Sequence, residues 1–147
     1  MDYSYTTTNG MPQVTGKYMY QMVETYYRDM LSFASYTLME IYDFIKNIPY
    51  QEDSDKAEVL IRPALLLAGI PGAGDCDDKS IALASWAYLR GIPYRFLAVR
   101  SKEKKDLHHV YPELYINGAW LTCDATYNFN SIGRDRTPFA EYVVLER

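Results

Sequence analysis

Apolar side chains recur at helical spacing through the first third of the chain. The stretch 17–47 contains no glycine and no proline. This pattern predicts one long helix or two consecutive helices that end before Ile48-Pro49. The polar, threonine-rich stretch 1–16 is expected to be an N-terminal arm, and residues 17–147 a single domain. The apolar positions at helical spacing are Met19, Val23, Tyr26, Met30, Phe33, Leu38, Ile41 and Ile45.

A loop with unusual backbone geometry is predicted in the middle of the chain. A short helix is expected over 57–68, interrupted near Pro63 because proline lacks the N–H that a helix interior uses. The stretch 69–74 then holds three glycines and a proline in the sequence GIPGAG. Such a composition is typical of a loop whose backbone adopts conformations that other residues avoid.

A second strong helix follows this loop. Asp75 is a predicted N-cap, and Asp78 stands three residues later, where its backbone N–H can be capped. The helix is expected to run over 76–90 and to end at Gly91, with Pro93 just beyond. Cys76 is therefore predicted in the first turn of a helix that follows a glycine loop.

The remainder of the chain has the pattern of β-strands. Asn117-Gly118 is the strongest short-range signal for a two-residue hairpin turn. Because helices come first and strands later, we expect the α+β class, with N-terminal helices packed on an antiparallel sheet. The predicted strands cover 94–100, 108–116, 119–126 and 141–145.

The predicted hairpin places His109 and Asp124 on one face. With Asn117-Gly118 as the turn, Tyr111 faces Asp124, and side chains alternate between the two faces along each strand. His109 and Asp124 then become diagonal neighbours, close enough for a carboxylate to orient an imidazole. The opposite face carries only apolar or small residues, namely Val110, Pro112, Leu114, Ile116, Ala119, Leu121, Cys123 and Ala125.

This alternation also predicts how the layers pack. His108 directly precedes His109 in the strand, so its side chain is expected to point to the opposite face of the sheet. We expect the 76–90 helix to pack on the face that holds His109, through Tyr111, Tyr115 and Trp120. The long N-terminal helix would then cover the apolar face. Glu113 and Tyr111 are predicted to be packing residues or supports of the site.

Cys76 is the candidate nucleophile of the chain. A thiol attacks as thiolate, and both a helix N-terminus and a neighbouring imidazolium favour that form. Asp75, Asp77 and Asp78 oppose ionisation, so we expect the thiolate to depend on His109. A cysteine is more often a small buried hydrophobic residue, and that interpretation suits Cys123.

Composition and charge narrow the function classes. Hydrophobic residues make up 48% of the 147 residues, and the net charge is −4 with no basic stripe. These values are typical of a globular protein and argue against nucleic acid as a partner. The two cysteines are too few for a disulfide framework. The chain shows neither a signal-peptide pattern nor an apolar run long enough for a membrane span, so a cytoplasmic protein is expected.

Two other features leave alternatives open. Tyrosine is abundant, with 15 residues in the chain, and it serves either helix packing or a partner surface on the N-terminal helix. A metal site built from Cys76, His108, His109 and Cys123 is a weaker hypothesis, because these residues lack compact ligand spacing. No metal or other cofactor is therefore expected.

Three motifs stand in order along the chain. They are GDCDDKS at 74–80, followed by LRGIP at 89–93; HVYPELYINGAW at 109–120; and LTCDAT at 121–126. Together they resemble the nucleophile helix, the histidine strand with its hairpin, and the aspartate strand of the transglutaminase-like superfamily of papain-like cysteine enzymes. The short GDCDD form is similar to versions encoded by bacteriophages.

The resemblance implies a papain-like fold and a catalytic triad. Cys76 would be the nucleophile, His109 the general base and acid, and Asp124 the residue that orients the imidazole. The superfamily transfers acyl groups from amides through a thioester, to water or to an amine, so a peptide or protein amide is the implied substrate. The backbone N–H of Cys76 is one candidate oxyanion donor, and the sequence identifies no second donor.

A competing hypothesis from a different class is a structural or interaction module. Such a module, for example a bacteriophage virion component, would keep the triad with little or no turnover. The tyrosine-rich N-terminal half and the polar arm motivate it, and a protein partner would bind there. In that case the protein would be found in the host cytoplasm or in the virion.

Overall fold

The computed structural model describes residues 4–7, 12–51, 58–69, 74–134 and 139–147. Helices and strands occur together, and most helices precede most strands along the chain, as the α+β class requires. The elements are β1 (Ser4–Thr7), α1 (Pro12–Tyr26), the 3₁₀ helix η1 (Tyr27–Phe33), α2 (Leu38–Lys46), β2 (Glu58–Ile61), α3 (Pro63–Leu67), α4 (Cys76–Leu89), β3 (Tyr94–Arg100), β4 (His109–Ile116), β5 (Ala119–Thr122) and β6 (Glu141–Val144).

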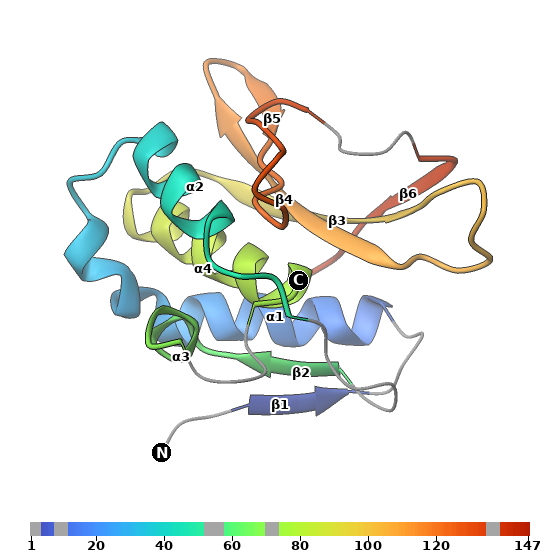
Figure 1. The fold of residues 1–147 in the computed structure, drawn as a ribbon, viewed down its shortest axis with the longest axis horizontal. Coiled ribbons are helices and arrows are strands. Elements are labelled where there is room, and N and C mark those ends of the chain that lie inside the picture. Colours follow the sequence, from blue (N-terminus) through green and yellow to red (C-terminus); the bar gives the residue numbers. More distant parts are fainter. Residues whose placement is uncertain (1–3, 8–11, 52–57, 70–73, 135–138) are drawn as a thin grey trace.

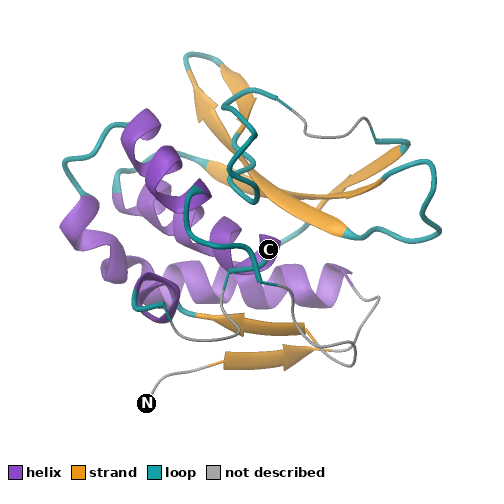
Figure 2. Ribbon diagram, in the orientation of Figure 1, coloured by secondary structure: helices purple, strands orange, loops and turns teal. Residues whose placement is uncertain are grey.

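The helices lie between two sheets (Figure 1). The larger sheet has four strands in the order β5-β4-β3-β6, and all of its neighbouring strands are antiparallel. The smaller sheet pairs β1 with β2 on the other side of α1. Figure 2 shows the helices gathered in one layer, with the larger sheet against one side of it. The α+β architecture of helices on an antiparallel sheet is confirmed.

The N-terminal helical region consists of two α-helices joined by a 3₁₀ segment. The break lies near Thr37, whose hydroxyl accepts from the backbone N–H of Glu40 while the Glu40 carboxylate accepts from the N–H of Thr37. This capping box starts α2 and satisfies two backbone donors. The stretch 1–16, expected to be an arm, contains β1 and the first residues of α1.

The helix predicted over 57–68 is wrong in its first half. Residues Glu58–Ile61 form strand β2, which pairs with β1, and only Pro63–Leu67 is helical. The stretch Val59-Leu60-Ile61 contains two β-branched residues, which favour a strand when a partner strand is available. Pro63 begins α3 at a position where its missing N–H has no cost.

The predicted hairpin and its register are confirmed. Ile116 pairs with Ala119 and Glu113 with Thr122. Asn117 and Gly118 both have positive φ, 54° and 83°, as a type I′ turn requires. β5 ends at Thr122, earlier than predicted, although the Cys123 N–H still donates to the Pro112 carbonyl.

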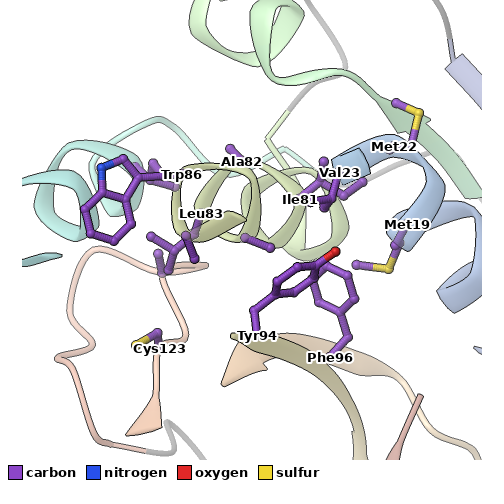
Figure 3. Close-up of a cluster of buried hydrophobic side chains, with 14 of the residues drawn as sticks. Met19, Met22, Val23, Ile81, Ala82, Leu83, Trp86, Tyr94, Phe96 and Cys123 are labelled. Carbon is purple, nitrogen blue, oxygen red and sulfur yellow. The ribbon is translucent and has the colours of Figure 1, made fainter. Parts of the chain in front are cut away.

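The prediction of which sheet face packs on the Cys76 helix is wrong. Helix α4 packs on the apolar face, where Leu83 and Trp86 belong to the same buried cluster as Val110, Leu114 and Cys123. Figure 3 shows Leu83, Trp86 and Cys123 in this cluster. Helix α1 packs on this face as well, since the Tyr20 hydroxyl accepts from the Phe96 N–H and donates to the Leu145 carbonyl. Burial of the larger apolar surface decides this arrangement.

The opposite face of the sheet carries a small cluster of its own. Leu97, Val99 and Tyr111 are buried there, with Phe139 packed against them. Tyr115 and Trp120, expected to contact the helix, are instead 43% and 37% exposed. Glu113 forms an ion pair with Arg95 at 2.7 Å and so supports the pairing of β3 with β4.

Candidate active site

The loop before Cys76 requires glycine at position 74. Gly74 has a φ of +122°, and a Cβ placed on it would lie 2.5 Å from the carbonyl oxygen of Pro49. The Gln51 N–H donates to the Gly74 carbonyl at 3.3 Å, so the stretch 49–51 lies directly beside Gly74. A side chain at 74 would therefore both strain the backbone and displace this neighbour.

Buried carboxylates fix the start of α4. Asp75 caps the helix as predicted, because its Oδ1 accepts from the Asp78 N–H at 3.0 Å. The Asp78 carboxylate in turn accepts from the N–H groups of Gly74 at 3.1 Å and Ile61 at 3.4 Å. The acidic residues of this motif thus hold Gly74 and the end of β2 against the first turn of α4.

Cys76 is the first residue of α4 and is partly exposed. Its thiol donates to Asp77 Oδ1 at 3.8 Å. One turn further along the helix, the Ser80 hydroxyl donates to the Val110 carbonyl at 3.4 Å. Since Val110 follows His109 directly, this contact brings the N-terminal turns of α4 against the start of β4.

His109 and Asp124 meet as the hairpin predicts. His109 Nε2 and Asp124 Oδ2 are 2.7 Å apart, and the two side chains are 16% and 2% exposed. When Nε2–H donates to this carboxylate, Nδ1 is the nitrogen that can accept a proton. The predicted contact is confirmed, and the imidazole is held in one orientation.

Asp124 is held from several sides. Its Oδ1 accepts from the Thr126 N–H at 3.1 Å, and its backbone carbonyl accepts from the Tyr42 hydroxyl at 2.7 Å and from Asn130 Nδ2 at 3.0 Å. Burial alone would raise the pKa of Asp124, but the hydrogen bonds and charge of His109, together with Thr126, hold this pKa below its usual value. The carboxylate therefore stays ionised at neutral pH.

His108 and Cys123 have structural surroundings, as their parity predicts. His108 Nε2 accepts from the Ser101 N–H at 3.1 Å and so closes the turn between β3 and β4. Cys123 is fully buried in the apolar cluster. Burial raises the pKa of its thiol to about 12, with a smaller contribution from the charge of Glu113. Cys123 therefore stays a thiol at neutral pH.

Lys79 is a structural feature of the site that the sequence analysis missed. Its side chain is only 1% exposed, and its ammonium group donates to the backbone carbonyls of Lys46 at 3.4 Å, Ile48 at 2.5 Å and Thr126 at 2.9 Å. These bonds tie the first turn of α4 to the end of α2 and to the segment after Asp124. The available signal was a lysine followed directly by a run of small or apolar residues at 80–87.

Replacing Lys79 by methionine is expected to lower the free energy of unfolding by about 3 kcal/mol, because methionine keeps the volume but leaves buried carbonyls without a donor. Burial lowers the pKa of Lys79 from 10.5 to about 8, although the charge of Asp124 opposes the shift. The folded protein thus releases this proton before the unfolded chain does, so the contribution of Lys79 to stability rises with pH between these values.

Urea unfolding of wild type and Lys79→Met at pH 7.5 and 9.5 measures both effects. The loss in the variant is expected to be larger at pH 9.5, since the wild type gains stability across this range. Lys102→Met is the matched control, because Lys102 is exposed in the turn between β3 and β4. If Lys79→Met lowers the free energy of unfolding by less than about 1 kcal/mol, the size of a surface effect, the hydrogen bonds of Lys79 do not stabilise the fold as proposed.

Comparison with known proteins identifies the family. The family model described as the transglutaminase-like superfamily matches residues 32–125, well over half of the chain. The chain belongs to the transglutaminase-like superfamily. The mixed helix and antiparallel-sheet architecture of this transglutaminase-like protein agrees with the family. A search of curated protein sequences finds no significant match.

A solved structure similar to the transglutaminase-like chain is that of a putative cysteine protease from Cytophaga hutchinsonii. The two chains are 15% identical with a TM-score of 0.45, and the alignment covers 95% of the present chain and 52% of the other. The present chain thus spans about half the length of that protein.

Two further findings concern the rest of the transglutaminase-like chain. Among the residues that the structure describes, no three His, Cys, Asp or Glu side chains are grouped so that they could hold a metal ion. Within the same residues, every helix is too short or too polar to cross a lipid bilayer.

Proposed function

We propose that this transglutaminase-like protein transfers acyl groups from an amide substrate through Cys76, His109 and Asp124. The observation that carries the proposal is the 2.7 Å contact between His109 Nε2 and the buried, ionised Asp124. This contact leaves Nδ1 as the proton acceptor of the imidazole. The position of Cys76 in the first turn of α4, which packs against the start of β4, supports its role as the partner of that nitrogen.

The first half of the reaction forms a thioester. His109 Nδ1 takes the proton from the Cys76 thiol, and the sulfur bonds to the carbonyl carbon of the amide. The carbon–nitrogen bond of the resulting tetrahedral intermediate then breaks. The imidazolium gives its proton to the leaving nitrogen, so that an amine departs and the acyl group remains on Cys76.

The second half regenerates the enzyme. Water or an amine bonds to the thioester carbon and gives a proton to His109 Nδ1. The carbon–sulfur bond breaks, and the proton returns to the sulfur, directly or after release. Asp124 stabilises the imidazolium in both halves while remaining a carboxylate, as in the serine-protease triad.

Charge on the carbonyl oxygen also needs stabilisation in both intermediates. The backbone N–H of Cys76 lies in the first turn of α4, where N–H groups point out of the helix start. An oxyanion placed over this turn also benefits from the positive end of the helix dipole. This argument supports the N–H of Cys76 as one donor of the oxyanion hole.

p-Nitrophenyl acetate tests the proposal, because a reactive thiolate displaces p-nitrophenolate and keeps the acetyl group. We expect a rapid burst of p-nitrophenolate equal to one acetyl group per protein, with that group found on Cys76 by peptide mass spectrometry. Slower deacylation should follow. Cys123→Ser should give the same burst, whereas Cys76→Ser should give none.

The opposite result is equally clear. If the folded protein carries no acetyl group on Cys76 under conditions that acetylate a small free thiol, the proposed acyl transfer is wrong. The chain would then be better described as an interaction module that retains the scaffold of an enzyme.

A further inference from the structure

A continuous run of aromatic rings extends from the imidazole of His109 to the protein surface. The Tyr127 ring stacks on His109, with ring centroids 6.3 Å apart and an interplanar angle of 23°. Phe129 stacks on Tyr127 at 5.3 Å and 9°, and Tyr50 contacts Tyr127 at 4.9 Å. We call Tyr50, Tyr127 and Phe129 the aromatic ledge.

The aromatic ledge joins the two sides of the proposed site. Tyr50 precedes Gln51, whose N–H is bonded to the Gly74 carbonyl, two residues before Cys76. Tyr127 comes from the other side, three residues after Asp124. Their contact therefore links the segment that is bonded to Gly74 with the segment that follows Asp124.

The turn that carries Tyr127 and Phe129 is anchored to the residue that orients His109. Asn130 is 2% exposed, and its Nδ2 donates to the carbonyls of Asp124 at 3.0 Å and Arg134 at 2.9 Å. Its backbone N–H also donates to the Tyr127 carbonyl at 3.2 Å. Tyr127 and Phe129 are thus fixed relative to the imidazole, as a preformed binding surface requires.

The outer part of the aromatic ledge is exposed despite being apolar. Phe129 is 58% exposed and Tyr50 is 37% exposed. Removing a large apolar side chain from water lowers the free energy, so a bound apolar group would be stabilised here. The three ledge residues are two tyrosines and one phenylalanine, with no acidic or basic side chain among them. Such a surface favours a flat or bulky neutral group over a charged one.

We propose that the aromatic ledge binds an aromatic or large apolar side chain on the amine side of the scissile amide. This inference rests on the proposed function. In that function His109 exchanges a proton with the departing or attacking nitrogen, so groups stacked on the imidazole lie on the amine side. The same surface therefore selects the leaving amine in the first half and an acceptor amine in the second.

Acceptor competition on the acetylated enzyme tests this inference. Acetyl-Cys76 is prepared with p-nitrophenyl acetate, and its decay is followed with phenylalaninamide or glycinamide at equal concentrations of free base. We expect phenylalaninamide to react about tenfold faster in the wild type, an effect of the size expected for burying one large apolar side chain. In Phe129→Ala the ratio of the two rates should fall to a value between about 1 and 3.

The readout is a ratio within one protein, so a general loss of activity in a variant cancels. Tyr142→Ala is the matched control, because Tyr142 is a 56% exposed aromatic residue on β6, and the wild-type ratio is expected there. If the preference for phenylalaninamide is lost in Phe129→Ala but kept in Tyr142→Ala, the result supports the proposed binding role of the aromatic ledge.

Other outcomes would contradict the proposed binding role of the aromatic ledge. A wild-type ratio near one, or an unchanged ratio in Phe129→Ala, overturns it while leaving the proposed function intact. Faster reaction with glucosamine than with phenylalaninamide overturns it in favour of a sugar-binding surface. If acetyl-Cys76 never forms, the proposed function fails and the ledge proposal fails with it.

Discussion

Iodoacetamide is expected to alkylate Cys76 at least ~100-fold faster than Cys123 in the folded protein at neutral pH, because alkylation rate follows thiolate fraction and access. Cys123 is fully buried, and its pKa is raised to about 12. Cys76 is partly exposed at the start of α4. Peptide mass spectrometry after timed quenching measures both rates in one sample.

Unfolding provides the control for this ratio. In concentrated urea both cysteines become exposed side chains of an unfolded chain, so the two rates should approach each other. Equal rates in the folded protein, or faster labelling of Cys123, would contradict the assignment of Cys76 as the nucleophile.

Asp124→Asn is expected to lower the rate of acetyl transfer from p-nitrophenyl acetate by about 10⁴-fold, the cost of the analogous change in a serine protease. An asparagine amide donates to His109 Nε2 and so leaves the proton on Nδ1. That tautomer cannot accept the proton of the Cys76 thiol. Single-turnover release of p-nitrophenolate measures the rate, and circular dichroism checks that the variant is folded.

His109→Ala separates the roles of the two residues. The rate of Cys76 alkylation as a function of pH should shift to higher pH in this variant, because Asp77 disfavours the thiolate and the imidazolium no longer offsets it. If a folded His109→Ala protein keeps the wild-type profile, Cys76 and His109 are not coupled. The triad would then be abandoned in favour of a binding function.

Local rules were sufficient for the parts of the site that lie close together in the sequence. Asn117-Gly118 specifies a tight turn, and the alternation along the two adjoining strands then determines that His109 meets Asp124. The N-cap of α4 follows in the same way, because Asp75 and Asp78 are three residues apart. The contacts of the Lys79 side chain and of the aromatic ledge could not be predicted from residues nearby in the sequence.

Long-range contacts decided the rest. The stretch 58–61 became a strand because β1 was available to pair with it, although its own sequence also suits a helix.

The sequence by itself determined the hairpin, the helix that begins at Cys76 and the pairing of His109 with Asp124, since each depends on neighbours a few residues apart or on one turn. The tertiary structure alone decided that α4 covers the apolar face. It also decided that Lys79 reaches carbonyls of two other segments, and that Tyr50 meets Tyr127. These contacts join residues far apart in the chain, and they follow from burying the largest apolar surface while satisfying each buried polar group.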